Sequence, residues 1–368
     1  MAFFSKLFGR PPIEIAGLDV GSVTTKVVEL VKVSDVIKAC RIGICNTPPL
    51  AIKDEVISDP QLVADELKQL ILSKKFEAKK VVTLVTGRSV VIRTIEMTIM
   101  TDRELKNSVK FEAERYLPYS VAEAQIDGVI IRKPIPGDEK KMEVLLLAAL
   151  RDRIIDAEEV TKRSGFQVSA IELEPLAIMR LLQHTLSSEE LKQTIAFINI
   201  GANTSNINIF KEGILRHNRV VTVAGNSFTR AIGQAMNLSF DEAESLKKEK
   251  GSIRIEKEGA PVSPTTMRIF NVIAPVLTEL ITEIQRTFDF YRSRYRGETV
   301  DLIYLAGGTS KLKNIDRYFS DEIGIRTELF DPFKKIQLES NAGISKENLA
   351  DAAPHLTVVL GLALRPLT

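Results

Sequence analysis

The chain has 368 residues, which is more than one hydrophobic core usually serves, so we expect two lobes or domains. Its apolar content of 44% is ordinary for a soluble globular protein, and 50 basic against 48 acidic residues leave a net charge of only +2. This balance indicates neither a nucleic-acid-binding protein nor a charged tail. Cys40 and Cys45 are too few for a disulfide framework or a zinc site, so we expect free thiols in a reducing cytosol.

Residues 1–12 form an N-terminal tail. No segment of the chain reaches the ~20 apolar residues that a membrane-spanning helix needs, and the tail has no signal-peptide cleavage site. We favour a disordered tail. The alternative is a small amphipathic foot for a membrane surface or a partner, because four apolar residues recur beside Lys6 and Arg10 over two helical turns: Phe3, Phe4, Leu7 and Phe8.

Residues 13–90 are rich in predicted strands. Buried-strand patterns cover 13–20, 24–30, 37–45 and 79–87, and Gly87 breaks the last of them. Asp59 as N-cap and Pro60 in the first turn predict an amphipathic helix through Leu72.

Residues 91–167 form a compact insert of strand, helix, two strands and helix. A strand over 90–97 precedes a helix over 102–117, for which we predict Asp102 as the cap. The segments 124–135 and 142–150 predict a hairpin, because a Gly-Asp turn signal lies between them. A helix over 151–165 and a strand over 166–174 follow.

The pattern of the first lobe then starts again. Glu174 opens a helix over 174–186, and three strands are predicted within 196–223. Helices follow over 226–237, 239–251 and 264–295. A strand over 301–308 ends in two glycines and precedes a helix over 310–324. We expect an exposed loop over 338–346 and a closing helix capped by Asp351.

Two strand–turn–strand segments have the same design. GLDVGSVTTKVVEL (17–30) and FINIGANTSNINIF (197–210) each place a glycine after a buried strand, followed by small side chains with hydroxyl or amide groups. Glycine lets the backbone approach a ligand, and the amides of such a turn form a cup for phosphate oxygens. A third stretch, LIYLAGGTSKLKNI (302–315), combines a strand, a Gly-Gly turn and a helix start beside which a nucleotide would fit. We therefore predict that two hairpins, one from each lobe, hold one polyphosphate.

These three stretches resemble the actin-like ATPase superfamily, which includes actin, the Hsp70 ATPase domain, sugar kinases, MreB and FtsA. The insert resembles the extra subdomain of the FtsA-like branch, and residues 102–120, 223–251 and 358–365 resemble the PilM family of type IV pilus assembly. The resemblance implies an α/β fold with two actin-like lobes built from duplicated ribonuclease-H-like cores. It divides the chain into a first lobe (13–90, 168–193 and 352–368), the inserted subdomain (91–167) and a second lobe (194–351).

The resemblance also implies ATP or ADP with Mg²⁺ as ligands. Asp19 would orient Mg²⁺ through water, with Asn199 at the matching position of the second hairpin. Glu174 matches the carboxylate that positions the attacking water in MreB-like proteins, although an acidic residue at a helix start needs no such role. The implied nucleotide-binding residues lie on the two hairpins, on the helices after the second hairpin and on the Gly-Gly turn: Gly21, Ser22, Thr24, Thr25, Lys26, Gly201, Asn203, Thr204, Gly225, Asn226, Glu244, Lys247, Gly307 and Gly308.

Two roles within this set have alternatives. Glu244 and Lys247 match the residues that grip the ribose and base, but without the family they would be a solvent-exposed helix face. Asn199 stands where the family has Asp, and Ala224 stands where a second glycine is usual. Because an amide carries no charge for the metal, we expect nucleotide binding with slow or absent hydrolysis.

The function implied by the resemblance is that of an assembly adaptor in the cytoplasm, peripheral to the inner membrane. PilM-like proteins hold the N-terminal peptide of the membrane protein PilN in a groove between the first lobe and the inserted subdomain, which connects them to other platform and motor proteins. The groove residues that we predict are Phe111, Arg115, Tyr116 and Leu117, although core packing is the competing use of such apolar side chains. The alternatives are an FtsA-like or other actin-like filament protein that self-associates, a small-molecule kinase of the same fold, and a scaffold that has lost its nucleotide.

Overall fold

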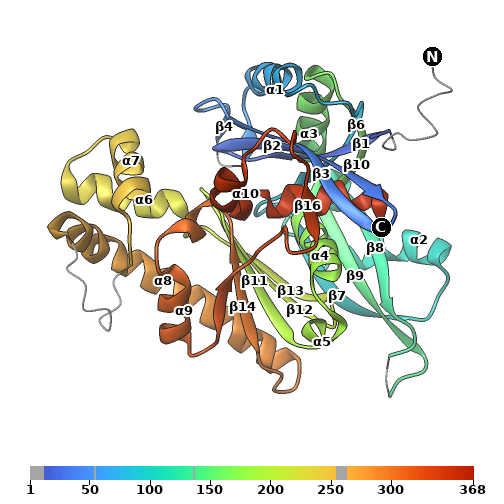
Figure 1. Ribbon diagram of the computed structural model, residues 1–368. Helices are drawn as coiled ribbons and strands as arrows, with labels where there is room; N and C mark the ends of the chain where they lie inside the picture. The colour runs from blue at the N-terminus through green and yellow to red at the C-terminus, as the bar shows by residue number, and fades with distance from the viewer. Residues whose placement is uncertain (1–11, 54, 136, 254–262) are drawn as a thin grey trace, which may run out of the picture. The chain divides into compact units, whose positions relative to one another are not determined.

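The computed structural model describes residues 12–53, 55–135, 137–253 and 263–368 (Figure 1). The apolar residues of the predicted N-terminal tail, from Phe3 to Phe8, lie outside the described residues. The chain forms two compact units, which we describe one at a time: residues 1–185 with 332–368, and residues 186–331. The lobe boundaries predicted from the sequence, at 193/194 and 351/352, lie further along the chain than these borders.

The first unit is built on a six-stranded sheet in the order β10-β6-β1-β2-β3-β16. β1 pairs antiparallel with β2 and parallel with β6, so the carboxyl ends of β1, β6 and β10 lie at one edge. A two-stranded ribbon joins β3 to the first helix. The strands are β1 (Ile15–Val20), β2 (Thr24–Val33), β3 (Val36–Asn46), β4 (Ile52–Lys53), β5 (Val56–Ile57), β6 (Lys80–Val85), β10 (Gln167–Leu173) and β16 (Ile336–Leu338).

Helices cover both faces of this sheet (Figure 1). On one face, Leu18 of β1 packs in a core with Leu67 of α1 and Val160 of α3. On the other face, β1 places Gly17 so close to α10 that an added Cβ would lie 2.4 Å from the carbonyl oxygen of Val359. The helices are α1 (Pro60–Lys74), α3 (Arg151–Arg163), α4 (Glu174–Thr185) and α10 (Lys346–Leu364), with a final 3-10 turn over Arg365–Leu367. The alternation along β1 thus buries both sides of the strand.

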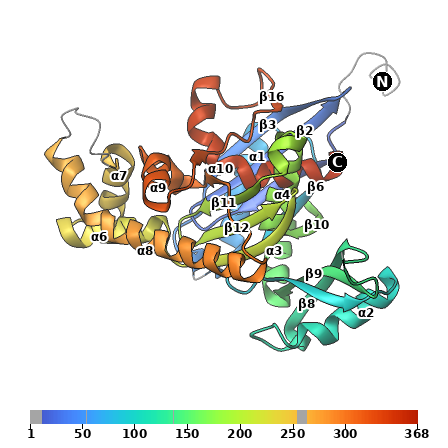
Figure 2. The ribbon, with the colours of Figure 1, turned by 90° about the horizontal axis from the view of Figure 1, so that it is seen from below.

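The insert within the first unit is a three-stranded antiparallel sheet in the order β7-β9-β8, with α2 on one face (Figure 2). Its elements are β7 (Val91–Thr98), α2 (Asp102–Ala113), a 3-10 turn over Val121–Glu123, β8 (Ala124–Arg132) and β9 (Lys141–Leu150). Two sequence predictions were wrong here. The cap of α2 is Thr101 rather than Asp102, and the helix ends at Ala113 rather than at residue 117. α3, predicted as the insert's last helix, contributes Val160 to the core of the six-stranded sheet.

The second unit repeats the sheet of the first. Its order, β13-β12-β11-β14-β15, matches β3-β2-β1-β6-β10, with antiparallel pairing between the first three strands of each and parallel pairing between the rest. The duplicated core expected from the sequence is therefore present. The strands are β11 (Thr194–Ile200), β12 (Ser205–Lys211), β13 (Ile214–Val221), β14 (Leu302–Ala306) and β15 (Thr327–Leu329).

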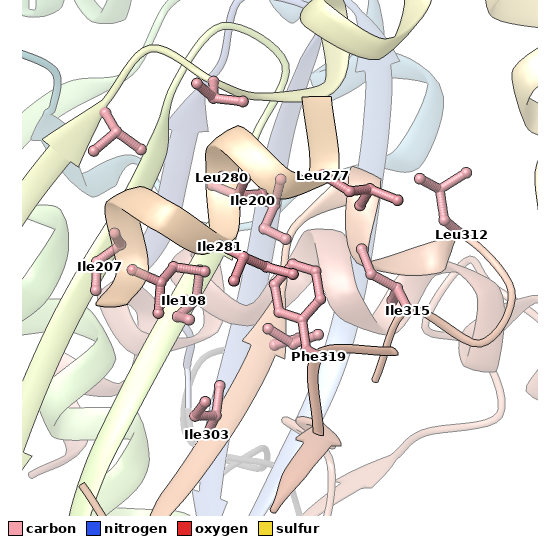
Figure 3. Packing of buried hydrophobic residues seen from close by; sticks show 14 of the residues in the cluster. Ile198, Ile200, Ile207, Leu277, Leu280, Ile281, Ile303, Leu312, Ile315 and Phe319 are labelled. Atoms are coloured by element: carbon pink, nitrogen blue, oxygen red, sulfur yellow. The ribbon is translucent and has the colours of Figure 1, made fainter. Parts of the chain in front are cut away.

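One face of this second sheet packs against α8 and α9 (Figure 3). Ile198, Ile200 and Ile303 lie against Leu277 and Ile281 of α8 and against Ile315 and Phe319 of α9. The helices of the unit are α5 (Ser188–Leu191), α6 (Gly225–Met236), α7 (Phe240–Lys250), α8 (Pro264–Arg294) and α9 (Ile315–Ile323). Where the sequence predicted one helix over 310–324, a 3-10 turn over Gly308–Lys311 comes first.

The C-terminal segment differs from its prediction at two points. α10 begins at Lys346 behind the cap Ser345, so Asp351 lies inside the helix and does not cap it. The short strand β16 pairs in parallel with β3 just before the expected exposed loop. Among the described residues, no helix is both long and apolar enough to cross a bilayer.

Candidate functional site

The first hairpin closes tightly around Gly21. Gly21 N–H donates to the carbonyl oxygen of Thr24 at 3.1 Å, and Lys26 Nζ reaches Asp19 Oδ2 at 2.9 Å and the same carbonyl at 3.2 Å. An added Cβ on Gly21 would lie 2.8 Å from Thr24 O, so glycine is required. Behind the tip, Thr47 donates its hydroxyl to Gly21 O at 2.6 Å and lies 3.0 Å from the hydroxyl of Thr25.

The outer tip of this hairpin offers backbone donors. Its residues Ser22 and Thr24 are half-buried and Val23 is exposed. Within the described part of the chain, the N–H groups of Ser22 and Val23 donate no hydrogen bond. Two adjacent amides beside a lysine ammonium form the kind of concave donor surface that holds phosphate oxygens.

Glu174 lies at the same edge of the sheet as Asp19. β6 and β10 end opposite each other, with Val85 beside Leu173, so Thr86 and Glu174 follow side by side. Thr86 Oγ1 donates to Glu174 Oε2 at 3.1 Å, and Glu174 is only 5% exposed at the start of α4. β1 lies two strands from β10, about 10 Å away at the usual strand spacing. One edge therefore carries Asp19, Lys26, Thr86 and Glu174.

In the second unit, the carbonyl oxygen of Gly201 joins three loops. Gly201 N–H closes the second hairpin on Thr204 O at 3.0 Å, as Gly21 does on Thr24. Gly201 O accepts from Gly225 N–H at 3.0 Å and from Thr309 Oγ1 at 3.1 Å. The hairpin tip, the start of α6 and the turn after β14 thus meet at one carbonyl group.

Two further contacts fix this junction. Asn226 donates its N–H to Ala202 O at 2.8 Å and its Nδ2 to Asn203 Oδ1 at 2.7 Å, which ties the first turn of α6 to the hairpin tip. Gly307 has a φ of +86°, and an added Cβ would lie 2.4 Å from Ile200 O and 2.6 Å from Asn199 Oδ1. Gly307 thus brings the turn that continues through Gly308 against the end of β11.

Glu244 and Lys247 of α7 face the start of α6. Lys247 Nζ donates to Gly225 O at 3.0 Å and to Thr229 Oγ1 at 2.7 Å, and it lies 2.6 Å from Glu244 Oε2. Burial lowers the pKa of Lys247 more than the pairing with Glu244 raises it. Burial raises the pKa of Glu244, but hydrogen bonds from Lys247 and Thr229 outweigh it and hold that pKa below its ordinary value. The pair is therefore not the exposed helix face of the alternative reading.

The metal assignments rest on oxygen donors from the two hairpins. No cluster of three or more His, Cys, Asp or Glu side chains is found in the described ranges, so a site enclosed by carboxylates is absent there. Asp19 would suit a Mg²⁺ ion that keeps most of its water, since such an ion needs only one or two protein carboxylates. Asn199, paired with Asn206 across β11 and β12, offers an amide oxygen without charge.

The predicted groove residues of the insert divide into two groups. Phe111 is 78% exposed and Tyr116 is 40% exposed, and Arg115 forms an exposed pair with Glu112 at 3.2 Å. Leu117 instead packs against the insert's hydrophobic core. An apolar surface for a partner can therefore include the side chains of Phe111 and Tyr116, but only part of Leu117.

Four threonines of these sites were not predicted. Thr47 and Thr86 support the first hairpin and Glu174, while Thr229 and Thr309 connect the loops of the second unit. Each bonds to a group between 18 and 108 residues away in the chain, so no local pattern marks it.

Comparison with known proteins confirms the fold. A solved structure described as a PilM–PilN type IV pilus biogenesis complex aligns with a TM-score of 0.85 and 27% identity over 97% of this chain and 100% of that one. MreB 5 of Spiroplasma citri bound to AMPPNP aligns with a TM-score of 0.52 and 16% identity over 94% of each chain. The cell division protein FtsA of Streptococcus pneumoniae is 22% identical over 94% of this chain and 81% of its own.

A family model described as type IV pilus assembly protein PilM matches residues 17–367. The match includes both hairpins, the insert and the Gly-Gly turn. Because it spans well over half of the chain, the chain belongs to the PilM family of type IV pilus assembly proteins.

Proposed function

We propose that this protein is an ATP-binding adaptor of the type IV pilus platform. The observation that carries the proposal is the repeated hairpin: Gly21 and Gly201 close the same turn at the same place in two equivalent sheets. Both turns lie at the carboxyl ends of parallel strands, where ligands of α/β sheets commonly bind. The MreB 5 structure with AMPPNP has the same fold and supports a nucleotide as the ligand.

The residues of each unit fit parts of ATP. The Ser22 and Val23 amides with Lys26 suit phosphate oxygens, as do the hairpin tip at Asn203 and the start of α6. The turn at Gly307 and Gly308 suits the adenosine, where an absent side chain lets the backbone come close. A bound Mg²⁺ would neutralise phosphate charge, with Asp19 orienting its water shell.

We propose that hydrolysis is slow. Glu174, held by Thr86, can orient a water molecule at the edge that carries Asp19. Phosphoryl transfer to water depends mainly on placement and on charge neutralisation. Asn199 carries no charge where the family has Asp, so one carboxylate that would assist hydrolysis is missing. We therefore expect the protein to bind nucleotide but to hydrolyse it slowly.

The nucleotide proposal is tested on the purified full-length protein. Bound nucleotide is released by denaturation and identified by chromatography, and Mg-ATP binding is measured by calorimetry. We expect ATP or ADP in the preparation, saturable binding, and turnover well below the ~10 s⁻¹ typical of enzymes. Absence of binding at millimolar ATP would refute the proposal, and turnover like that of a metabolic kinase would refute slow hydrolysis.

We further propose that the insert binds the cytoplasmic N-terminal peptide of a PilN-like membrane protein, which would hold the adaptor at the inner membrane. The match to the PilM–PilN complex supports this partner. Phe111 and Tyr116 are the exposed apolar side chains on or just after α2 that could take part. Large exposed aromatic groups are common anchors of interfaces.

Peptide binding is tested with Phe111→Ala and Tyr116→Ala. Each should weaken binding of the peptide by at least about tenfold, which corresponds to ~1.4 kcal/mol, without altering thermal stability. The matched control is Leu72→Ala on α1, because Leu72 is 63% exposed but lies outside the insert. Equal peptide affinity in all three variants would place the peptide elsewhere.

A further inference from the structure

Lys247 uses its whole donor capacity inside the protein. The residue is 7% exposed, although it lies on a helix whose other lysines are exposed. Its three nearest polar partners are Gly225 O, Thr229 Oγ1 and Glu244 Oε2, at 3.0, 2.7 and 2.6 Å. A lysine ammonium has three N–H groups. These partners therefore account for all of them.

Glu244 is similarly committed. Its Oε2 accepts from the Thr229 hydroxyl at 2.5 Å and from Lys247, and its Oε1 lies 3.3 Å from Lys248 Nζ. Thr229 itself is fully buried. At Oε2, ribose hydroxyls would have to compete with two short, charge-assisted contacts.

The same contacts hold the start of α6. Gly225 is the first residue of that helix; its carbonyl accepts from Lys247, and its N–H donates to Gly201 O. An added Cβ on Gly225 would lie 2.5 Å from Thr309 Oγ1, so the start of α6 packs closely against the turn after β14. A displacement of Lys247 would therefore move the turn that presents α6 and Asn226 beside the hairpin tip.

We infer that Lys247 and Glu244 are positioning residues, which act through Thr229 and Gly225 to fix the phosphate-binding end of the site rather than to grip ribose and base. The inference rests on the proposed function, because it concerns how the same nucleotide is held. It departs from the role that the family resemblance implies for these residues. The ligand chemistry that depends on Lys247 is then the polyphosphate.

Ligand fragments separate the two roles. If Lys247 fixes the phosphate side, its loss weakens the binding of both inorganic tripolyphosphate and ATP and leaves the binding of adenosine almost unchanged. If Lys247 grips the nucleoside, its loss weakens the binding of ATP and adenosine and leaves the binding of tripolyphosphate unchanged. Tripolyphosphate and adenosine share no chemical group, so the two roles predict opposite results for them.

The experiment measures binding of Mg-ATP, Mg-tripolyphosphate and adenosine to the full chain by competition against a fluorescent ATP analogue. Lys247→Met and Thr229→Val should each weaken the binding of ATP and tripolyphosphate at least tenfold. Their affinity for adenosine should stay within twofold of wild type. Thr229→Ser, which keeps the hydroxyl, should restore binding. The matched control is Lys250→Met, because Lys250 lies on the same helix, is half exposed and pairs only with Glu249 among the described residues.

If Lys247→Met does not fold, the comparison of Thr229→Val with Thr229→Ser still tests the inference, because only the first of them removes the hydroxyl that contacts Lys247. Loss confined to ATP and adenosine would overturn the inference. So would wild-type protein that binds ATP but not tripolyphosphate, since the phosphate end would then bind nothing by itself. If wild type binds none of the three ligands, the proposed function fails first, and that result is distinct from either of these.

Discussion

Gly307 combines a left-handed backbone conformation with a crowded Cβ position. Its φ of +86° disfavours any side chain, and an added Cβ would also overlap Ile200 O at 2.4 Å. We predict that Gly307→Ala lowers the free energy of unfolding by about 2–4 kcal/mol, because backbone strain and overlap with a carbonyl add together. Chemical denaturation followed by circular dichroism measures the change.

Gly324 provides the matched comparison for this substitution. It caps α9 with a φ of +75°, but an added Cβ there would meet nothing within 4 Å. Gly324→Ala should therefore cost only the strain of the left-handed conformation, about 1 kcal/mol. If both substitutions lower the free energy of unfolding equally, the backbone around Gly307 must shift enough to accommodate the added Cβ, and the prediction is wrong.

Some residues of the candidate site could be predicted from the sequence, and others could not. Gly21, Gly201 and Gly307 were predicted because glycine after a buried strand is a local signal. Thr229 and Thr309 were missed because their value depends on carbonyl groups that the fold brings from other segments. The side-chain direction of Lys247 was also not predictable, since helical spacing alone allows either an exposed or a buried pair with Glu244.

α2 is an element whose start depends on a reciprocal cap. Glu104 N–H donates to Thr101 Oγ1 at 3.3 Å, and Thr101 N–H donates to Glu104 Oε2 at 2.8 Å. We predict that Thr101→Ala lowers the stability of the insert by about 1 kcal/mol, the usual cost of an N-cap. Asp102→Ala is the control, because Asp102 is the first helical residue and should cost only the few tenths to ~1 kcal/mol of a helix-dipole contact. Amide hydrogen exchange in α2 measures both.

The same cap predicts a pH dependence. The hydrogen bonds from the Thr101 N–H and hydroxyl hold the pKa of Glu104 below its ordinary value of 4.5. A lowered pKa in the folded state means that the carboxylate stabilises the fold above pH 4.5 and that this contribution is lost as the pH falls through the folded value. The difference between wild type and Thr101→Ala should therefore shrink as the pH falls below 4.5. A difference that does not change over this acidic range would argue against the Glu104 half of the cap.

Long elements of this chain were predictable from periodicity, whereas short ones and boundaries were not. The strands of both hairpins and the long α8 have clear patterns over six or more residues. β16 has only three residues and exists because β3, almost 300 positions earlier, accepts it as a neighbour. Asp351 was predicted to start the last helix because it looks like an N-cap, although Ser345 caps α10 and the helix continues through Pro354.

At the scale of the whole molecule, the two units share a topology but not their charges. The first hairpin pairs Asp19 with Lys26 across its strands, and the second pairs Asn199 with Asn206 at the matching positions. The first hairpin therefore offers a charged pair to a ligand, and the second offers neutral amide groups. A nucleotide held by the first hairpin would stabilise the first unit, because that unit could open only after releasing it.

The chain contains a reporter for ligand binding in the first unit. Both cysteines lie on β3 of the first unit, Cys40 is 2% exposed, and burial raises the pKa of Cys45 to about 11. In a Cys45→Ser variant, thiol labelling of Cys40 in moderate urea therefore reports opening of the first unit. Mg-ATP at about 100 times its dissociation constant should slow labelling by up to ~100-fold, because opening requires release of the ligand.

The opposite result is equally informative. If ATP binds but leaves the labelling rate of Cys40 unchanged, the second unit holds the nucleotide alone, and the Asp19–Lys26 hairpin has another use.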